Sequence, residues 1–262
     1  MLSLAAIEED FADRMETTET VFWDDDGGVV RALKQRCLGA LVMRREPLQN
    51  PAPDAVTRTL LGAIRERGLD ALPWGEAARA LRQRLLFLNH IKAEGSWPDV
   101  SPATLTATLE EWLEPWLAGL TRWSEMARLD FHAILLAKLP GRERSSLDRL
   151  APAAVTVPSG RTHPIDYSES EAPVLKVRIQ EMFGLGQTPS IADGRVNLKL
   201  HLLAPSGRVL AVTSDLRGFW QSAYREVRAE MRGRYPKHPW PEDPLSALPT
   251  HRTSHRTRKN QV

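Results

Sequence analysis

The spacing of apolar residues changes along this chain, and that change restricts the fold more than any other feature. Between residues 54 and 150, apolar side chains recur three and four positions apart, which is the period of a helix with one buried face. Between residues 151 and 233, stretches of apolar and polar side chains alternate, as in half-buried strands. Because the two periods occupy separate segments, we predict an α+β fold with a helical middle followed by a small antiparallel sheet.

Turn residues subdivide both ends of the chain. Residues 24–28, Asp-Asp-Asp-Gly-Gly, lie between two β-type segments and predict an N-terminal β-hairpin, because glycine accepts the positive φ of a tight turn. A further short strand is expected over residues 37–43. The sequence Pro-Ser-Gly-Arg occurs at 158–161 and again at 205–208, each time between β-type segments, and it predicts two more hairpin turns.

Capping signals divide the helical middle. The two clearest apolar stripes are formed by Val56, Leu60, Ala63 and Ile64, and by Leu81, Leu85, Leu88 and Ile91. Gly68 is expected just past the end of the first helix, and Ser101-Pro102 can begin a third helix. We expect Pro115 to break that third helix. The tryptophans of this region are interpreted as core residues: Trp112, Trp116 and Trp123.

The C-terminal third gathers basic residues on two predicted surfaces. If two of its strands share a sheet, the solvent face of that sheet carries Lys176, Arg178, Lys199 and His201. Residues 215–233 predict one continuous helix, capped at Ser214 or Asp215, that packs an apolar stripe on the sheet. The arginines of that helix fall on one arc: Arg217, Arg225, Arg228 and Arg232. Such an arc suits phosphate binding, and pairing with acidic residues elsewhere is the equal alternative.

Proline spacing ends regular structure after residue 235. Prolines at 236, 239, 241, 244 and 249 exclude a helix and favour an extended path, along which Trp240 is expected to be the packing anchor. The stretch from His251 onward is basic and expected to be disordered. Four regions are thus predicted: 1–50 with short hairpins, 51–150 helical, 151–235 α+β, and 236–262 a proline-rich and then basic tail.

Composition favours a cytoplasmic protein. The single cysteine, Cys37, can form no internal disulfide, and no apolar run is long enough to cross a bilayer, so no membrane contact is expected. The formal net charge is only +2 over 262 residues, but residues 8–26 are mainly acidic and the C-terminal end is mainly basic. A basic end can be a nucleic-acid footprint or a solvated tail.

Motifs for an independent enzyme are missing from the sequence. No lysine follows a glycine, so a phosphate-binding P-loop is absent, and so is a DExH box. Histidine and cysteine are not clustered as zinc ligands would be, so no metal site is expected. Ser159, His163 and Asp166 lie close in sequence, but nothing near them resembles a nucleophile elbow. We therefore predict no catalytic residue.

The end of the chain resembles a known family. Residues 231–244, Met-Arg-Gly-Arg-Tyr-Pro-Lys-His-Pro-Trp-Pro-Glu-Asp-Pro, resemble the closing signature of HrpB-type DExH-box helicases. Further matching segments lie upstream at 213–216, 219–220, 177–184, 158–161, 165–167, 72–74 and 68–69. The resemblance therefore covers nearly the whole chain.

The resemblance implies the C-terminal portion of an ATP-dependent RNA helicase. In that family, two RecA-like ATPase domains precede helical domains, an OB-like domain and this C-terminal extension, so residues 1–50 would be a remnant of the OB-like region. The family's ATP-binding residues have no counterpart here, so ATP and Mg²⁺ would be bound by the missing core. We expect this chain to be inactive alone, as a fragment, a truncated product or one part of a separately encoded protein.

Two functions follow from the resemblance and the charge pattern. The leading one is an accessory module that supports a RecA-like helicase core, in cis or in trans, and contacts single-stranded RNA or another nucleic acid. Its candidate binding residues are Lys176, Arg178, Lys199, Arg217, Arg225, Arg228 and Arg232. The alternative is a purely structural interaction domain whose arginines contact acidic surfaces of the motor. Steep salt dependence of binding would favour the first.

Overall fold

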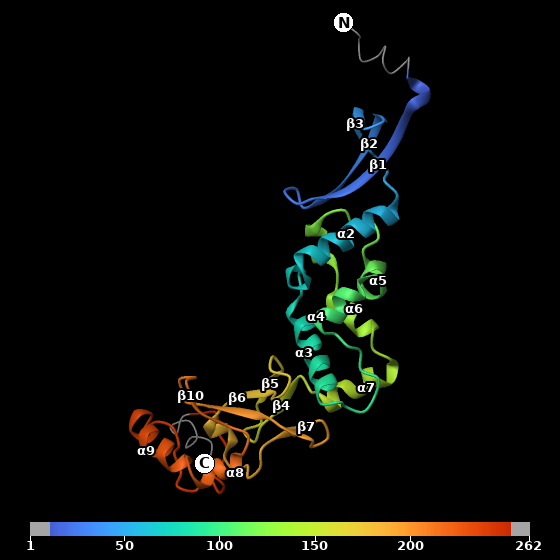
Figure 1. The fold of residues 1–262 in the computed structure, drawn as a ribbon. Coiled ribbons are helices and arrows are strands. Elements are labelled where there is room, and N and C mark those ends of the chain that lie inside the picture. The colour runs from blue at the N-terminus through green and yellow to red at the C-terminus, as the bar shows by residue number, and fades with distance from the viewer. Residues whose placement is uncertain (1–10, 253–262) are drawn as a thin grey trace. The chain divides into compact units, whose positions relative to one another are not determined.

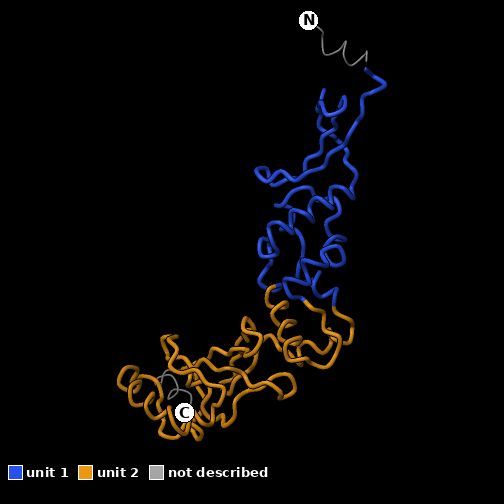
Figure 2. The backbone as a smooth tube through the Cα atoms, in the orientation of Figure 1, with its two compact units in different colours: residues 1–78, 100–138 blue, residues 79–99, 139–262 orange. Residues whose placement is uncertain are grey.

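A computed structural model describes residues 11–252 and divides the chain into two compact units (Figure 2). The first unit comprises residues 1–78 and 100–138, and the second comprises residues 79–99 and 139–262. Helices and strands occupy separate segments, so the predicted α+β class is confirmed (Figure 1). The acidic residues before 11 and the basic tail after 252 lie outside the described residues. The four regions drawn from the sequence remain a prediction.

The first unit opens with a three-stranded antiparallel sheet in the order β1-β2-β3. Its elements, after the short 3-10 turn η1 (Ala12–Arg14), are β1 (Met15–Asp24), β2 (Val29–Leu38) and β3 (Leu41–Pro47). The hairpin turn predicted at residues 24–28 is confirmed, with Gly28 at a φ of 57°. The strand predicted over residues 37–43 is wrong, because Gly39 also adopts a φ of 57° and turns the chain between β2 and β3.

Helices and 3-10 turns complete the first unit. They are α2 (Pro53–Arg67), η2 (Leu69–Ala71), α4 (Pro102–Ala107), α5 (Leu109–Trp112), η3 (Glu114–Trp116), η4 (Trp123–Arg128) and α6 (Phe131–Ala137). Gly68 follows α2 and Ser101 caps α4, both as predicted. The helix break expected at Pro115 occurs earlier, at Thr108, whose hydroxyl donates to the Thr104 carbonyl at 2.8 Å. Such hydroxyl bonds compete with the helical ladder and bend it.

The tryptophans of the first unit do not form the single core cluster that the sequence predicted. Trp112 is buried and stacks on Trp74, with ring centroids 6.0 Å apart. Trp123 packs edge-on against Trp23 of β1 at 6.2 Å. Trp116 is 46% exposed, so its assignment to the core is wrong. Because the chain breaks after Trp112, Trp116 no longer shares that residue's buried helix face.

The second unit is built around a five-stranded sheet in the order β10-β9-β6-β5-β4. The strands are β4 (Ala154–Thr156), β5 (Thr162–Asp166), β6 (Val174–Arg178), β9 (Lys199–Leu203) and β10 (Val209–Thr213). The β6–β9 pair is parallel and the other pairs are antiparallel. Both Pro-Ser-Gly-Arg sequences turn the chain between antiparallel neighbours, as predicted.

The second unit contains further elements besides that sheet. They are the larger part of α3 (Glu76–His90), α7 (Gly141–Leu150), η5 (Ile179–Met182), the small pair β7 (Ser190–Ile191) and β8 (Val196–Asn197), and the helices α8 (Leu216–Gln221) and α9 (Tyr224–Arg234). The sheet's inward side chains Leu175, Val177, Leu200 and Leu202 are almost fully buried. Figure 1 shows α8 and α9 beside the sheet.

The single helix predicted over residues 215–233 is wrong, although Asp215 does cap its start. The helix stops at Ser222, whose φ and ψ of −119° and −85° are not helical. The Ser222 hydroxyl donates to the Gly218 carbonyl at 2.6 Å, which helps to end α8. The break lets both Trp220 and Tyr224 bury against Phe183 beneath them, at ring distances of 6.0 and 6.3 Å. Aromatic packing therefore overrides the helical period.

The proline-rich segment follows an extended path along the second unit, as predicted. The Gly184 amide donates to the Pro244 carbonyl at 2.9 Å, and the Thr250 amide donates to the Gln180 carbonyl at 2.9 Å. Trp240 is only 7% exposed. These contacts fix the segment between residues 236 and 252 against η5 and the loop that follows it.

Candidate nucleic-acid interface

The basic residues on the sheet share a face, as expected from their alternation. Strands β6 and β9 run side by side, with Lys176 opposite His201. Each lysine is held by an acid: the Lys176 ammonium lies 3.3 Å from Asp166, and the Lys199 ammonium lies 3.1 Å from Glu169. Exposed pairs of this kind contribute little stability, so phosphate oxygens can compete for either lysine.

Arg178 ends β6 and is half-buried. Burial is the main cause that lowers the pKa of His238, and the positive charge of Arg178 lowers that pKa further. The positive charge of Arg178 therefore affects His238 of the proline-rich segment, although Arg178 itself belongs to the sheet.

Arg228 differs from the other arginines of α8 and α9. Its side chain is 21% exposed, and its Nε donates to the Trp240 carbonyl at 2.9 Å. A second nitrogen lies 2.9 Å from the Glu242 carboxylate. Arg228 thus fastens the proline-rich segment to α9, and that use was not foreseen from the sequence.

Three other arginines are exposed to solvent and, unlike Arg228, hold no partner within residues 11–252. Arg217, Arg225 and Arg232 are exposed, and within residues 11–252 their guanidinium groups form no hydrogen bond or ion pair. Arg225 and Arg232 are seven positions apart on α9 and therefore lie on one side of that helix. Arg217 lies on α8, beyond the break at Ser222, so the four arginines do not form the single-helix arc that was predicted.

A cavity opens where α8 meets α9, beside Arg225. It measures about 340 Å³ and is lined by Trp220, Gln221, Tyr224, Arg225, Arg228 and Glu242. No side chain caps the start of α9, so its positive end adds to the arginine charge. Burial raises the pKa of the Tyr224 hydroxyl, which stays protonated and donates to the Pro241 carbonyl at 2.9 Å. The guanidinium group of Arg225, which is free at this cavity, suits a phosphate group.

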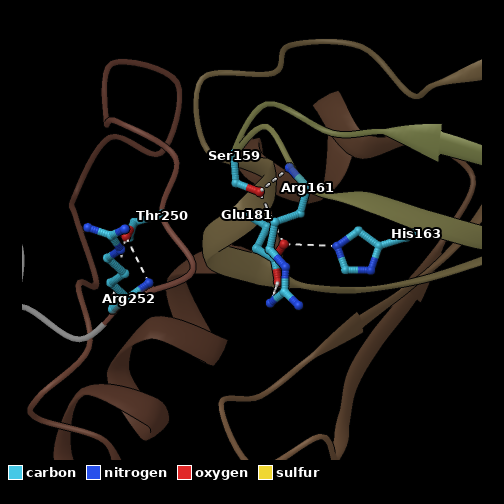
Figure 3. Close-up of polar contacts among 6 residues, drawn as sticks. All are labelled: Ser159, Arg161, His163, Glu181, Thr250 and Arg252. Atoms are coloured by element: carbon cyan, nitrogen blue, oxygen red, sulfur yellow. Dashed lines mark hydrogen bonds and ion pairs between the residues drawn. The ribbon is translucent and has the colours of Figure 1, made fainter.

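Ser159 and His163 meet at a carboxylate that was not considered from the sequence. Figure 3 shows both side chains turned toward Glu181, which is 1% exposed. The Ser159 hydroxyl donates to Glu181 Oε2 at 3.1 Å, and His163 Nε2 lies 2.8 Å from the same oxygen. Asp166 is not a member, because it binds Ser168 and Lys176 instead.

The Glu181 cluster has the geometry of a structural clamp. The serine hydroxyl is bonded to the carboxylate and not to the imidazole, so His163 is not positioned to activate it as a Ser-His pair would require. The cluster ties the β4–β5 hairpin to η5, and Figure 3 shows Thr250 and Arg252 of the C-terminal segment close by. Sequence reasoning missed Glu181 because a single glutamate after a strand carries no distinctive signal.

Within the described part of the chain, no group of three or more histidine, cysteine, aspartate or glutamate side chains is arranged to hold a metal ion. None of the helices between residues 11 and 252 combines the length and apolarity needed to span a bilayer.

The sequence is similar to that of one helicase family. The family model described as ATP-dependent helicase C-terminal, HrpB_C, matches residues 112–244. The model for the connector region of the ATP-dependent RNA helicase HrpB matches residues 14–48. ATP-dependent RNA helicase HrpB of Escherichia coli strain K12 is 42% identical over 239 residues, which make up 91% of this chain and 30% of that protein.

The fold is similar to two solved structures. A crystal structure of the E. coli DExH-box NTPase HrpB superposes with a TM-score of 0.75 at 40% identity, covering 97% of this chain and 31% of that one. A crystal structure of the Escherichia coli DEAH/RHA helicase HrpB gives a TM-score of 0.64 at 41% identity, covering 87% and 29%. The chain thus spans about a third or less of the length of these relatives.

Proposed function

From the premise that this chain belongs to the HrpB family of ATP-dependent helicases, as a C-terminal portion, we propose that it supports a helicase motor and binds nucleic acid. The nucleic acid is single-stranded RNA, and the motor is a RecA-like core that binds ATP and Mg²⁺. The proposed location is the cytoplasm. This chain contributes a charged surface and a docking surface, and the ATPase chemistry belongs to the motor.

The observation that carries nucleic-acid binding is the set of three uncommitted arginines, Arg217, Arg225 and Arg232. An arginine already paired with a carboxylate loses that partner when it binds phosphate, whereas these three have no partner within residues 11–252 to lose. Each phosphate contact releases counterions from the nucleic acid, so binding weakens as salt rises. Lys176, Lys199, Arg178 and Arg228 form a second group whose contacts require exchange of an existing partner or local rearrangement.

The test is a titration of fluorescent single-stranded RNA at two salt concentrations. Replacement of Arg217, Arg225 and Arg232 by glutamine is expected to weaken binding and to reduce the salt slope by up to about three, or about one for each lost phosphate contact. The matched control replaces three other exposed arginines with glutamine, Arg58, Arg79 and Arg128, and is expected to keep most of the affinity. Equal losses in both variants, or unchanged binding in the first, would overturn the proposed interface.

Exposed apolar side chains favour the supporting role as a second function. Phe22, Leu41 and Val42 lie on the β1–β2–β3 sheet, and Leu41 is 67% exposed. Leu41 and Val42 lie together beside the β2–β3 turn, and this end of the sheet is the proposed contact with the motor. Replacement of Leu41 by serine is expected to weaken association with the separately expressed motor in analytical ultracentrifugation. The control variant is Leu248→Ser, which changes an exposed leucine in the other unit.

A further inference from the structure

A second cavity of about 340 Å³ lies elsewhere in the second unit, and the proposed function does not use it. Its walls come from the segment after α3, from one face of α7 and from the turn between β7 and β8. On α7, Arg142, Ser146 and Arg149 are spaced four and three residues apart, so they share the face that lines the cavity. Its volume lies at the lower end of the range typical of small-molecule sites.

Charges in this cavity are mixed, and the mixture restricts what it can bind. Three arginines and three acids line it, but Arg149 and Asp193 are paired with one another. Arg142 remains to face an anionic group, and so do the other nitrogens of Arg195, which donates one hydrogen bond to the Ile91 carbonyl at 3.0 Å. Glu94 and Glu143 remain to accept hydrogen bonds. A simple anion would satisfy only the arginines. The ligand must therefore carry both a negative group and hydrogen-bond donors.

Several of the polar groups have unused bonding capacity. Within residues 11–252, the Arg142 guanidinium and the Ser146 hydroxyl form no hydrogen bond or ion pair. Glu143 is 7% exposed, and its Oε1 accepts one hydrogen bond, from the Ser96 amide at 2.8 Å. A carboxylate has about four lone-pair sites, so Glu143 can accept further donors from a ligand. Trp97 adds an aromatic wall beside it.

The backbone around this cavity is held in an uncommon conformation. Three non-glycine residues in the described chain have positive φ: Lys92, Ala192 and Asp193. Asp193, at 56°, lines the cavity, and its pairing with Arg149 holds the β7–β8 turn against α7. Gly95 also lines it at a φ of 122°, and a Cβ there would lie 3.2 Å from Glu143 Oε1. The φ of Asp193 belongs to the tight turn between the antiparallel strands β7 and β8, and that turn places the Asp193 carboxylate at the cavity wall.

We propose that this cavity binds a nucleoside monophosphate and prefers guanine as the base. Arg142, Arg195 and the Ser146 hydroxyl receive the phosphate, and the base lies along Trp97. Guanine presents adjacent ring N–H and exocyclic amine donors, which match the two oxygens of Glu143, whereas uracil has no exocyclic amine. The source is either a free nucleotide or a terminal or unstacked nucleotide of an RNA strand. The inference does not depend on the arginines of α8 and α9.

The test follows the indole N–H signal of Trp97 in two-dimensional NMR while the whole chain is titrated with GMP, UMP or inorganic phosphate. We expect saturable binding of GMP with a Kd of roughly 1 mM or tighter. A bidentate base contact predicts that GMP binds at least about tenfold more tightly than UMP. Absence of saturation by GMP at about 10 mM, or equal affinity for GMP and UMP, would overturn the proposal.

Variants assign the contacts. Arg142→Gln is expected to weaken GMP and phosphate binding together, and Glu143→Gln is expected to reduce the preference for GMP over UMP. The matched control is Arg144→Gln, on the same helix but outside the cavity lining, and it is expected to bind GMP normally. If Glu143→Gln does not fold, Arg142→Gln and Ser146→Ala still test the phosphate contacts of the cavity. Neither of these two residues is buried, so both variants are expected to fold. Equal losses from Arg142→Gln and Arg144→Gln would contradict the site.

Two further experiments are needed. The first distinguishes a free nucleotide from a nucleotide of an RNA strand, and the second distinguishes this cavity from the proposed arginine interface. Displacement of GMP by an oligoribonucleotide ending in guanosine identifies an RNA nucleotide as the ligand, and failure of displacement identifies the free nucleotide. The variant lacking Arg217, Arg225 and Arg232 is expected to bind GMP unchanged, so loss of RNA binding and loss of nucleotide binding can be told apart.

Discussion

The Nε of Arg228 donates a hydrogen bond to the backbone carbonyl of Trp240 at 2.9 Å. Twelve positions separate the two residues, and this contact turns an arginine of α9 into a support for a segment that prolines keep out of any helix or sheet. The indole of Trp240 in turn donates to the Tyr235 carbonyl at 3.1 Å. The end of the second unit is thus held by side chains as well as by its few backbone bonds.

Replacement of Trp240 by alanine is expected to destabilise the second unit by about 3–5 kcal/mol, because a large buried aromatic leaves a cavity when truncated. Thermal unfolding followed by circular dichroism measures the change. Trp116→Ala serves as the control and should have a much smaller effect, since that indole is 46% exposed. An unchanged melting temperature for Trp240→Ala would show that the proline-rich segment contributes no packing energy.

Arg228 and Arg225 are expected to separate stability from binding. Arg228→Gln removes a charged hydrogen-bond donor to the Trp240 carbonyl and should lower the free energy of unfolding by about 1–2 kcal/mol. The ion pair with Glu242 adds little to this figure, because the Glu242 carboxylate is exposed to solvent. Arg225→Gln removes an uncommitted charge and should leave unfolding unchanged while weakening RNA binding. Urea denaturation and RNA titration of both variants check the contrast. The reverse pattern would refute these assignments.

Stability of the second unit should fall as the pH drops below neutrality. Burial lowers the pKa of folded His238 below its usual value of about 6.5, so the unfolded chain binds more protons in the interval between the two values. Stability is therefore fully present above about pH 6.5 and is lost as the pH falls through that interval. His238→Asn should show a smaller loss between about pH 7.5 and pH 5.5 in urea titrations. An equal loss in both proteins would sink the explanation.

Glu181 is expected to be a stability residue and not a catalytic one. Glu181→Ala leaves the Ser159 hydroxyl and the His163 ring without their buried partner, at a cost of about 1–3 kcal/mol. Asp166→Ala changes a partly exposed carboxylate outside the cluster and provides the comparison. Calorimetry measures both. Ester or phosphoester hydrolysis by the wild-type chain that disappears in Ser159→Ala would contradict the structural reading.

The purified chain is expected to hydrolyse no ATP, with or without RNA. The reason is chemical: the sequence has no glycine–lysine phosphate loop to hold the β- and γ-phosphates. A coupled phosphate-release assay on the isolated chain gives the answer. RNA-stimulated release that persists through a second chromatographic step, and that scales with this chain, would disprove the expectation.

Local patterns in the sequence predicted much of the fold because their causes are local. Gly68 past the end of α2, the Ser101 cap of α4 and the Pro-Ser-Gly-Arg turns each depend on a few neighbouring backbone angles and hydrogen bonds. The alternation around Lys176 and His201 likewise fixed a shared solvent face, because side chains on a strand point to opposite faces in turn. Family membership was visible in the residues around Trp240.

Contacts between distant residues decided the rest. The end of α8 at Ser222 follows from burying Trp220 and Tyr224 against Phe183, some forty positions upstream, and no helical period contains that information. Glu181 became a buried partner of Ser159 and His163 only when η5 met the β4–β5 hairpin. Sequence by itself determined the helix caps, the hairpin turns and the alternation of the strands, since those depend on nearest neighbours. Tertiary structure alone decided which arginines are occupied and which are free, because a charge finds its partner across space and not along the chain.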